Sequence, residues 1–169
     1  MERPTLPSPV VGNAGVPVRS DLPSRVCVVS LSGKLFAIDL RNIREVFVID
    51  AVTPVPGMPP VLVGLANLRG GVISIVDLRL MLGLPTAASD LQYAVVIKCG
   101  GNQVAVLVDD APEIRTVNAD HFLPAPQNGP MEQRSFVSSV LRMEDRLGGV
   151  LEIPMLLAQM DLAGIGMPS

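Results

Sequence analysis

Two consecutive glycines, Gly70 and Gly71, separate two apolar, strand-prone runs between residues 63 and 84. Tight two-residue hairpin turns need positive φ angles, which glycine adopts without steric cost. The pattern therefore predicts a β-hairpin that turns at this glycine pair. Arg69 comes directly before the turn, where a guanidinium on a rigid strand end can donate several hydrogen bonds to a partner's carboxylate or carbonyl oxygens. Arg69 is the first candidate functional residue.

The composition favours strands in a single domain. A chain of 169 residues is long enough to bury a core of its own. Hydrophobic residues make up 49% of the chain and aromatic residues only 3%, so aliphatic side chains have to fill that core. Many of them are β-branched, which favours strands. We therefore expect an all-β protein of short strands, in which helices serve only as connectors.

An internal repeat appears when residues 25–49 are aligned with residues 93–117, which requires no gap. The apolar positions of the two segments largely coincide, and a slip of one residue would turn a strand's core side chains to the wrong face. The repeat predicts two similar small β-barrels. Identical residues occur at Val28 and Val96, Gly33 and Gly101, Ala37 and Ala105, and Glu45 and Glu113.

Both ends of the chain differ in composition from its middle. Residues 1–23 contain five prolines with glycine and serine between them, and such a composition buries too little apolar surface to offset the entropy of ordering. We predict a flexible arm at 1–23, one folded domain at 24–162, and a flexible tail at 163–169.

Within the domain, we expect the first barrel to span about residues 24–85 and the second barrel about residues 91–153. A C-terminal helix at 154–162 should complete the first barrel, since proline is tolerated in the first turn of a helix. For the same reason, residues 61–65 are predicted to form a helical turn after a group of prolines. Residues 77–84 are predicted to form a short helix.

The charge pattern argues against nucleic acid as a partner. The chain has 13 basic and 16 acidic residues and a net charge of −3, and it has no basic stripe that would follow a phosphate backbone. No uncharged apolar run reaches the roughly 18 to 20 residues of a membrane helix, and the start lacks the pattern of a secretory signal. We expect a soluble, cytoplasmic protein with no direct membrane insertion.

Residues that could carry chemistry are few. His121 is the only histidine and lies in a predicted loop, where we expect a solvated side chain. Cys27 and Cys99 lie in apolar strand-like runs, which predicts reduced, buried cysteines. These residues do not have the spacing of a zinc site, and the glycine pairs precede strands, whereas a phosphate-binding loop precedes a helix. We predict no catalytic residue, no metal and no cofactor.

One enzymatic alternative concerns a cluster of charged residues. Asp109, Asp110, Glu113 and Arg115 could belong to a small-barrel enzyme or a nucleotide-binding module. Such a site would also need a phosphate cradle or an activated nucleophile, and the sequence shows neither pattern. A chain rich in strand edges and turns but poor in reactive groups fits better with a protein that binds other proteins.

Two sequence blocks resemble the CheW-like coupling proteins of bacterial chemotaxis. The first reads VGLANLRG at residues 63–70, and the second reads ISIVDLR at residues 73–79. The similarity extends over about residues 25–160. Shorter segments that resemble the family lie at residues 36–39, 43–46, 105–109, 145–146 and 156–157.

This resemblance implies two SH3-like five-stranded β-barrels that share a hydrophobic interface, in agreement with the internal repeat. It also implies an adaptor without enzymatic activity. The adaptor would link the cytoplasmic tip of a methyl-accepting chemoreceptor to the regulatory domain of a CheA-type histidine kinase. The output could be flagellar chemotaxis or a non-flagellar pathway such as twitching, surface sensing or second-messenger control.

The resemblance further implies that the receptor tip lies against a groove between the barrels. Neighbouring strand residues face opposite sides, so we expect one of Ile43 and Val46 to be a core residue. The family's kinase contacts use the barrel ends and are not assigned to residues here. The positions that match the family's receptor-binding residues are Leu40, Ile43, Glu45, Val46, Gly64, Arg69 and Tyr93.

Removal of residues 1–22 should leave the stability of the domain nearly unchanged, because a proline-rich polar segment contributes little buried apolar area. We expect the Tm of the truncated protein to lie within about 5 °C of the full-length value, which corresponds to roughly 1 to 2 kcal/mol for a chain of this size. Thermal unfolding followed by circular dichroism measures the difference. A larger decrease would show that the arm packs on the barrels.

Overall fold

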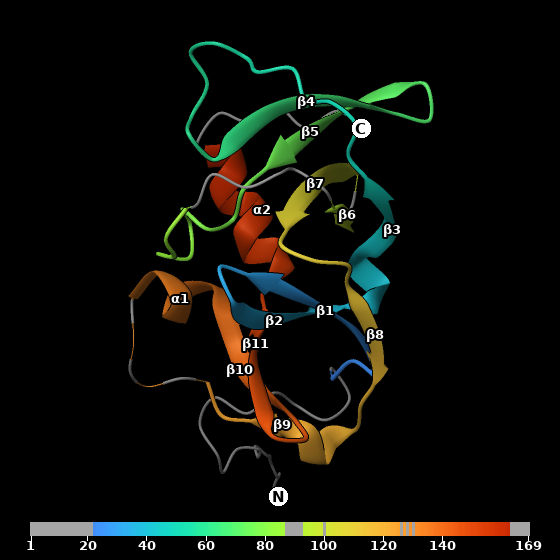
Figure 1. Ribbon diagram of the computed structural model, residues 1–169. Helices are drawn as coiled ribbons and strands as arrows, with labels where there is room; N and C mark the ends of the chain where they lie inside the picture. The colour runs from blue at the N-terminus through green and yellow to red at the C-terminus, as the bar shows by residue number, and fades with distance from the viewer. Residues whose placement is uncertain are drawn as a thin grey trace, which may run out of the picture.

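The computed structural model describes residues 22–86, 93–99, 101–125, 127, 129 and 131–162. Within these residues, one sheet has six strands in the order β8-β1-β2-β11-β10-β9, and the other has five in the order β3-β6-β7-β5-β4. The six-stranded sheet lies below the five-stranded sheet in Figure 1. The expected all-β fold with two SH3-like barrels is confirmed, and β9 is a short sixth strand that the sequence did not predict. The predicted arm and tail lie almost wholly outside the described residues.

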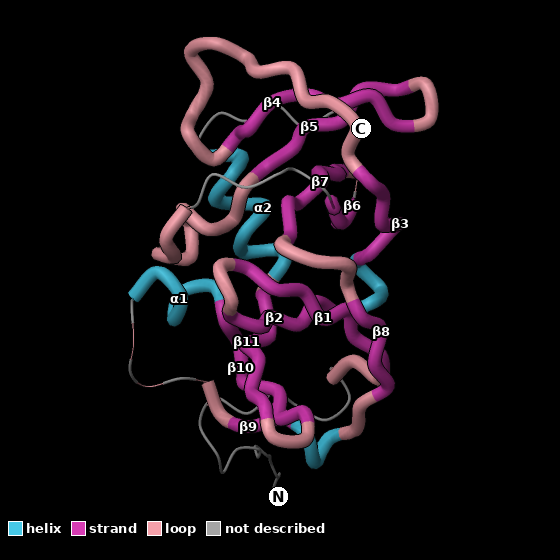
Figure 2. The backbone as a smooth tube through the Cα atoms, in the orientation of Figure 1, coloured by secondary structure: helices cyan, strands magenta, loops and turns pink. Residues whose placement is uncertain are grey.

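The strands are short and the helices lie between them or at the end, as Figure 2 shows. The predicted C-terminal helix is confirmed as α2 (Ile153–Leu162). The other helical elements are α1 (Met131–Phe136) and the 3-10 turns η3 (Leu40–Asn42) and η4 (Ala119–His121). The strands are β1 (Arg25–Leu31), β2 (Lys34–Asp39), β3 (Ile43–Val48), β4 (Leu62–Leu68), β5 (Gly71–Val76), β6 (Tyr93–Cys99), β7 (Asn102–Val108), β8 (Glu113–Thr116), β9 (Phe122–Leu123), β10 (Val137–Met143) and β11 (Arg146–Leu151).

The two halves of the chain exchange their first hairpins. The β1–β2 hairpin lies between β8 and β11, and the β6–β7 hairpin lies between β3 and β5. Each barrel therefore contains strands from both halves. The predicted division into barrels at 24–85 and 91–153 does not match this pairing. The physical reason is that the β1–β2 hairpin has two free edges whose backbone groups need hydrogen-bond partners, and β8 and β11 of the other half supply them.

The strand registers confirm the internal repeat. Val28 of β1 pairs with Glu113 of β8, and the equivalent residues, Val96 of β6 and Glu45 of β3, also pair with each other. The registers of the β1–β2 and β6–β7 hairpins match in the same way. The repeat therefore describes two barrels with the same strand pairing, related by the hairpin exchange.

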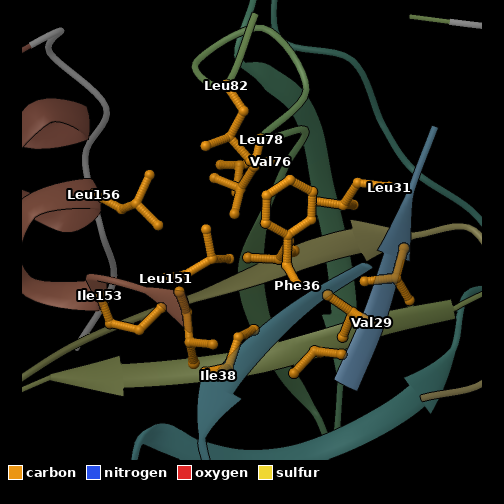
Figure 3. Close-up of a cluster of buried hydrophobic side chains, with 14 of the residues drawn as sticks. Val29, Leu31, Phe36, Ile38, Val76, Leu78, Leu82, Leu151, Ile153 and Leu156 are labelled. Carbon is orange, nitrogen blue, oxygen red and sulfur yellow. The ribbon is translucent and has the colours of Figure 1, made fainter. Parts of the chain in front are cut away.

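A shared apolar core holds the two sheets together. Along β1, Cys27, Val29 and Leu31 face this core, while Val26 and Val28 face the interior of the six-stranded barrel. Full burial of one aliphatic side chain contributes roughly 1.5 to 3 kcal/mol, so this cluster is the main source of stability at the junction. Its labelled members in Figure 3 are Val29, Leu31, Phe36, Ile38, Val76, Leu78, Leu82, Leu151, Ile153 and Leu156.

A buried arginine connects the two sheets by polar contacts. The Arg79 side chain, only 8% exposed, donates to Asp77 Oδ1 at 2.9 Å and to Asp109. Asp109 follows β7 and accepts hydrogen bonds from the N–H of Gly33 at 3.1 Å and from Ser30 Oγ at 3.2 Å. Since Ser30 and Gly33 belong to the β1–β2 hairpin, this network fixes the register between the sheets. We refer to it as the Arg79 clamp.

Two helix predictions are wrong. Residues 62–65 belong to strand β4, because Thr53 and Leu65 form a bridge and the segment pairs with β5. Residues 77–84 form successive turns, in which the hydrogen bond from Leu82 N–H to the carbonyl of Leu78, at 3.0 Å, has the spacing of an α-helix, whereas the bonds from Gly83 to Leu80 and from Leu84 to Arg79 do not. Helix nucleation is costly, and Gly83 interrupts the segment before it can propagate.

The turn of the β4–β5 hairpin is displaced by one residue from its predicted place. Leu68 pairs with Gly71, so the turn residues are Arg69 and Gly70, with φ angles of 54° and 80°. Gly71 is the first residue of β5. The sequence pattern also missed α1 (Met131–Phe136), because six residues carry too little periodicity.

Asp109→Asn should destabilise the protein at pH 7 by about 2 kcal/mol, because it removes a charged partner of the buried Arg79. Burial raises the pKa of Asp109, but hydrogen bonds from Gly33 and Arg79 outweigh it and hold the pKa below its usual value. The stabilisation is therefore present above the unfolded-state pKa of about 3.9 and is lost as the pH falls through the lower folded-state pKa.

Thermal unfolding at pH 7 and pH 3 tests this prediction. The Tm difference between the wild type and Asp109→Asn, about 4 to 8 °C at pH 7, should narrow at pH 3. Asp110→Asn is the matched control, since Asp110 is exposed and its substitution should leave the Tm unchanged at both pH values. An equal difference for Asp109→Asn at both pH values would contradict the role of its charge.

Candidate protein-docking site

An ion pair between Glu45 and Arg69 joins the two edges of the five-stranded sheet. Arg69 Nε lies 3.0 and 3.1 Å from the two carboxylate oxygens of Glu45, and Arg69 Nη2 lies 2.9 Å from Oε1. Glu45 is on edge strand β3, whereas Arg69 is in the turn that leaves edge strand β4. The pair thereby helps to close the sheet into a barrel. We call it the Glu45–Arg69 clasp.

In the clasp, the Arg69 side chain is largely exposed to solvent and the Glu45 carboxylate is largely covered. The Arg69 side chain is 74% exposed and that of Glu45 is 18% exposed, so the guanidinium is held in place while much of it faces solvent. Arg69 also has a φ of 54°, in the left-handed region that costs a non-glycine residue roughly 1 kcal/mol. Turn geometry alone would favour glycine or asparagine at this position. This strain makes the guanidinium a candidate for function.

The other predicted residues on and near β3 face different environments. Leu40, Ile43 and Tyr93 are partly buried and pack against the shared core. Val46 is exposed. Ile43 is thus the core-facing member of the Ile43 and Val46 pair. A β-bulge between Ile43 and Glu45 interrupts the alternation along β3, so Ile43 pairs with Ile97 of the shared core, whereas Glu45 pairs with Val96 of the five-stranded barrel's own core. The structure brings Glu45 and Arg69 into direct contact and places Val46 on the opposite face of the same strand.

Two exposed apolar residues near the clasp were missed by the sequence analysis. Val48, two residues beyond Val46 on β3, is 62% exposed, and Val72, just after the hairpin turn, is 56% exposed. Alternation along β3 could have indicated Val48, since residues two apart share a face. Nothing in the local pattern distinguishes Val72 from a core residue.

Gly64 is buried and has a packing role. A Cβ atom at this position would lie 2.3 Å from the carbonyl oxygen of Thr53 and 2.7 Å from Val52 Cγ1. The loop from β3 to β4 passes over β4 in Figure 2, and its Thr53 pairs with Leu65. Only glycine permits this close approach. Gly64 therefore acts through packing: it is buried and allows the loop to lie directly against β4.

The remaining candidates have structural partners. His121 is half-buried, and its Nδ1 accepts an exposed hydrogen bond from the N–H of Asn118, so this partly solvated side chain also caps η4. Cys27 is buried with a free thiol, and burial raises its pKa to about 11. The predicted state of the Cys99 side chain lies outside the described residues.

The charged cluster of the enzymatic alternative is divided between different contacts. Asp109 belongs to the Arg79 clamp, Asp110 is exposed, and Glu113 lies 3.5 Å from Arg115. Among the described residues, no group of three or more metal-ligating side chains comes together. The described helices also include none long and apolar enough to cross a membrane.

Two interlocked SH3-like barrels with a positioned guanidinium and exposed valines define a β-barrel adaptor, a class of protein that acts by contact with other proteins. The chain belongs to the CheW-like domain family, whose model matches residues 25–161. It is therefore a scaffold protein of the chemotaxis type.

Individual relatives agree with this assignment. The chain is 30% identical over 119 residues to the chemotaxis protein CheW of Rhizobium meliloti strain 1021, covering 70% of this chain and 77% of that protein. It is 27% identical over 129 residues to CheW of Bacillus subtilis strain 168, covering 76% and 83%. The crystal structure of the scaffolding protein TtCheW from Thermoanaerobacter tengcongensis has the same fold, with a TM-score of 0.67 and 23% identity over 78% of this chain and 90% of that chain.

Gly64→Ala should destabilise the fold by about 2 to 3 kcal/mol, because the new methyl group would press against backbone atoms of Thr53. We expect a decrease in Tm of about 5 to 10 °C in thermal unfolding. Gly101→Ala is the matched control, since no atom lies within 4 Å of a Cβ at that position. An unchanged Tm for Gly64→Ala would show that the loop can move away from β4 at little cost.

Proposed function

We propose that this protein couples methyl-accepting chemoreceptors to a CheA-type histidine kinase without catalysing a reaction. The receptor's cytoplasmic tip would bind beside the Glu45–Arg69 clasp, and the kinase's regulatory domain would bind elsewhere on the barrels. The family membership supports the general role. The residues Leu40, Ile43, Glu45, Val46, Gly64, Arg69 and Tyr93 are proposed as the receptor site, with Gly64 acting through the backbone it shapes.

The observation that carries the proposal is the conformation of Arg69. Its backbone is held in a region that disfavours a side chain, while its guanidinium remains largely exposed over an ordered carboxylate. An exposed ion pair contributes less than about 1 kcal/mol to stability, so the pair does not explain why arginine occupies this strained position. A docking role explains the arginine, because a guanidinium that is already held in place can donate hydrogen bonds to a partner at little entropic cost.

The exposed valines would supply an apolar surface next to the clasp, on the face of β3 that is opposite Glu45. Val46 and Val48 lie on the outer face of β3, and Val72 follows the turn that carries Arg69. Interfaces commonly combine an apolar centre with a few well-placed polar groups, and an amphipathic helix of a receptor tip would provide the complement. The proposal places the protein in the cytoplasm, at receptor arrays on the membrane.

Arg69→Ala should weaken receptor binding far more than it weakens the fold. Alanine at position 69 would have the same unfavourable φ as arginine, so the variant loses only the exposed ion pair. The change in the free energy of unfolding should therefore stay below about 1 kcal/mol. Loss of an anchoring arginine from an interface can cost 2 kcal/mol or more, which is roughly a thirtyfold rise in Kd. Calorimetry with the soluble receptor tip and with the kinase regulatory domain measures both affinities, which we expect to be micromolar for the wild type.

Two further variants make this test specific. Arg69→Lys should restore binding only in part, because an ammonium keeps the charge but lacks the planar fork. Arg44→Ala, on β3 next to Glu45, removes an exposed arginine that donates to Gln103 at 2.6 Å, and this variant should bind the receptor normally. The proposal would be refuted by a stable Arg69→Ala variant with wild-type binding, or by a wild type that binds neither partner at about 100 µM.

A further inference from the structure

The hairpin of the six-stranded barrel lacks side chains at two positions that its counterpart fills. The β10–β11 hairpin has the same register as the β4–β5 hairpin, and it carries Gly148 and Gly149 where β5 has Ile73 and Ser74. Ile73 is buried in the core of the five-stranded barrel. A Cβ atom at Gly148 would lie 3.0 Å from Met143 Cε, and one at Gly149 would lie 3.2 Å from both Cγ atoms of Val137. Side chains of the six-stranded barrel itself therefore occupy the space beside the two glycines.

A groove of about 750 Å³ runs along these glycines, and we call it the β11 groove. Apolar side chains of Val28, Phe36 and Val137 line it together with Gly148 and Gly149. Its volume is within the range of about 300 to 1,000 Å³ found for ligand sites. The exposed Leu147 extends the apolar lining to the surface.

Unpartnered hydrogen-bond donors gather on one side of the groove. Strands β2 and β11 are parallel, with Gly148 opposite Leu35, so Lys34 and Arg146 lie near each other at the starts of the two strands. Neither side chain has an ion-pair partner among the residues that the structure describes. Gln133 Nε2, also at the groove, is buried and has no hydrogen-bond partner within the described part of the chain.

The opposite side of the groove is acidic. Glu113 of β8 is separated from β2 by β1, a distance of roughly 10 Å at normal strand spacing. Its counterpart Glu45 is covered by Arg69, but the turn position equivalent to Arg69 is Glu144, with a similar φ of 58°. A glutamate cannot pair with Glu113, and Arg115 of β8 lies 3.5 Å from Glu113 and 3.7 Å from Glu144. The β10–β11 turn therefore provides no guanidinium to cover the Glu113 carboxylate in the way that Arg69 covers Glu45.

We propose that the β11 groove binds a short segment of a partner protein that carries a large apolar side chain next to a carboxylate. The apolar side chain would lie against Val137 and Leu147, and the carboxylate would accept hydrogen bonds from Arg146 and Lys34. A polyphosphate chain fits poorly, because Glu113 and Asp110 also line the groove. This site lies on the other barrel from the Glu45–Arg69 clasp and goes beyond the receptor coupling proposed above.

The experiment titrates the ¹⁵N-labelled full-length protein with the blocked peptide acetyl-Gly-Glu-Leu-Phe-Gly-amide and follows the backbone amide shifts. We expect shifts grouped at residues 33–36 and 146–149, with a Kd below about 1 mM at low salt. A matched peptide with lysine in place of glutamate should bind at least about tenfold more weakly, because its ammonium group would lie next to the positively charged Lys34 and Arg146.

Variants separate this site from the clasp. Arg146→Glu, an exposed substitution, should weaken peptide binding about tenfold or more and leave receptor binding unchanged, whereas Arg69→Ala should leave peptide binding unchanged. Arg44→Glu is the charge-matched control on the other barrel. If the receptor fails to bind the wild type, the coupling proposal fails while the peptide test stands.

Three results would overturn the proposal. The first is the absence of shifts at about 5 mM peptide, at which a site of about 1 mM Kd would be mostly filled. The second is equal binding of the glutamate and lysine peptides, or shifts centred on the Arg69 turn. The third is self-association in sedimentation velocity that Arg146→Glu abolishes, which would assign the groove to a second copy of the chain.

Discussion

The exchange of the β1–β2 and β6–β7 hairpins is the constraint on which the rest of this structure depends. Each barrel is completed by strands from the other half of the chain, so neither can close until distant segments have met. Such non-local pairing slows folding and makes the two barrels one cooperative unit. A scaffold gains from this arrangement, because faces on different barrels are held at a fixed spacing without a hinge.

Apolar and polar contacts contribute differently at the junction between the barrels. The shared core supplies most of the stabilisation, but aliphatic packing is non-directional and tolerates small shifts. The Arg79 clamp is directional, because its guanidinium must meet Asp77 and Asp109 while Asp109 accepts from the β1–β2 hairpin. Its main effect is therefore on register: a displacement of one sheet would leave a buried charge without its partner.

The two barrels keep equivalent backbones but have diverged in their surface chemistry. Glu45 and Glu113 are equivalent, yet the facing turn residue is Arg69 in one barrel and Glu144 in the other. One barrel thus presents a closed ion pair beside exposed valines, and the other presents an open groove with opposite charges on its two sides. A reversal of charge at equivalent positions is an effective way for two similar faces to select different partners.

The sequence by itself determined the strand-rich class, the repeat and its register, and the presence of a hairpin turn within one residue of its observed place at Arg69 and Gly70, because alternation and turn chemistry are local properties. The exchange of hairpins was decided only by the tertiary structure, since the repeat has the same apolar pattern whichever half covers it. Cross-strand pairing also made a strand of residues 62–65 and buried Gly64 beneath Thr53. These outcomes depend on contacts between residues far apart in the chain, which no local pattern records.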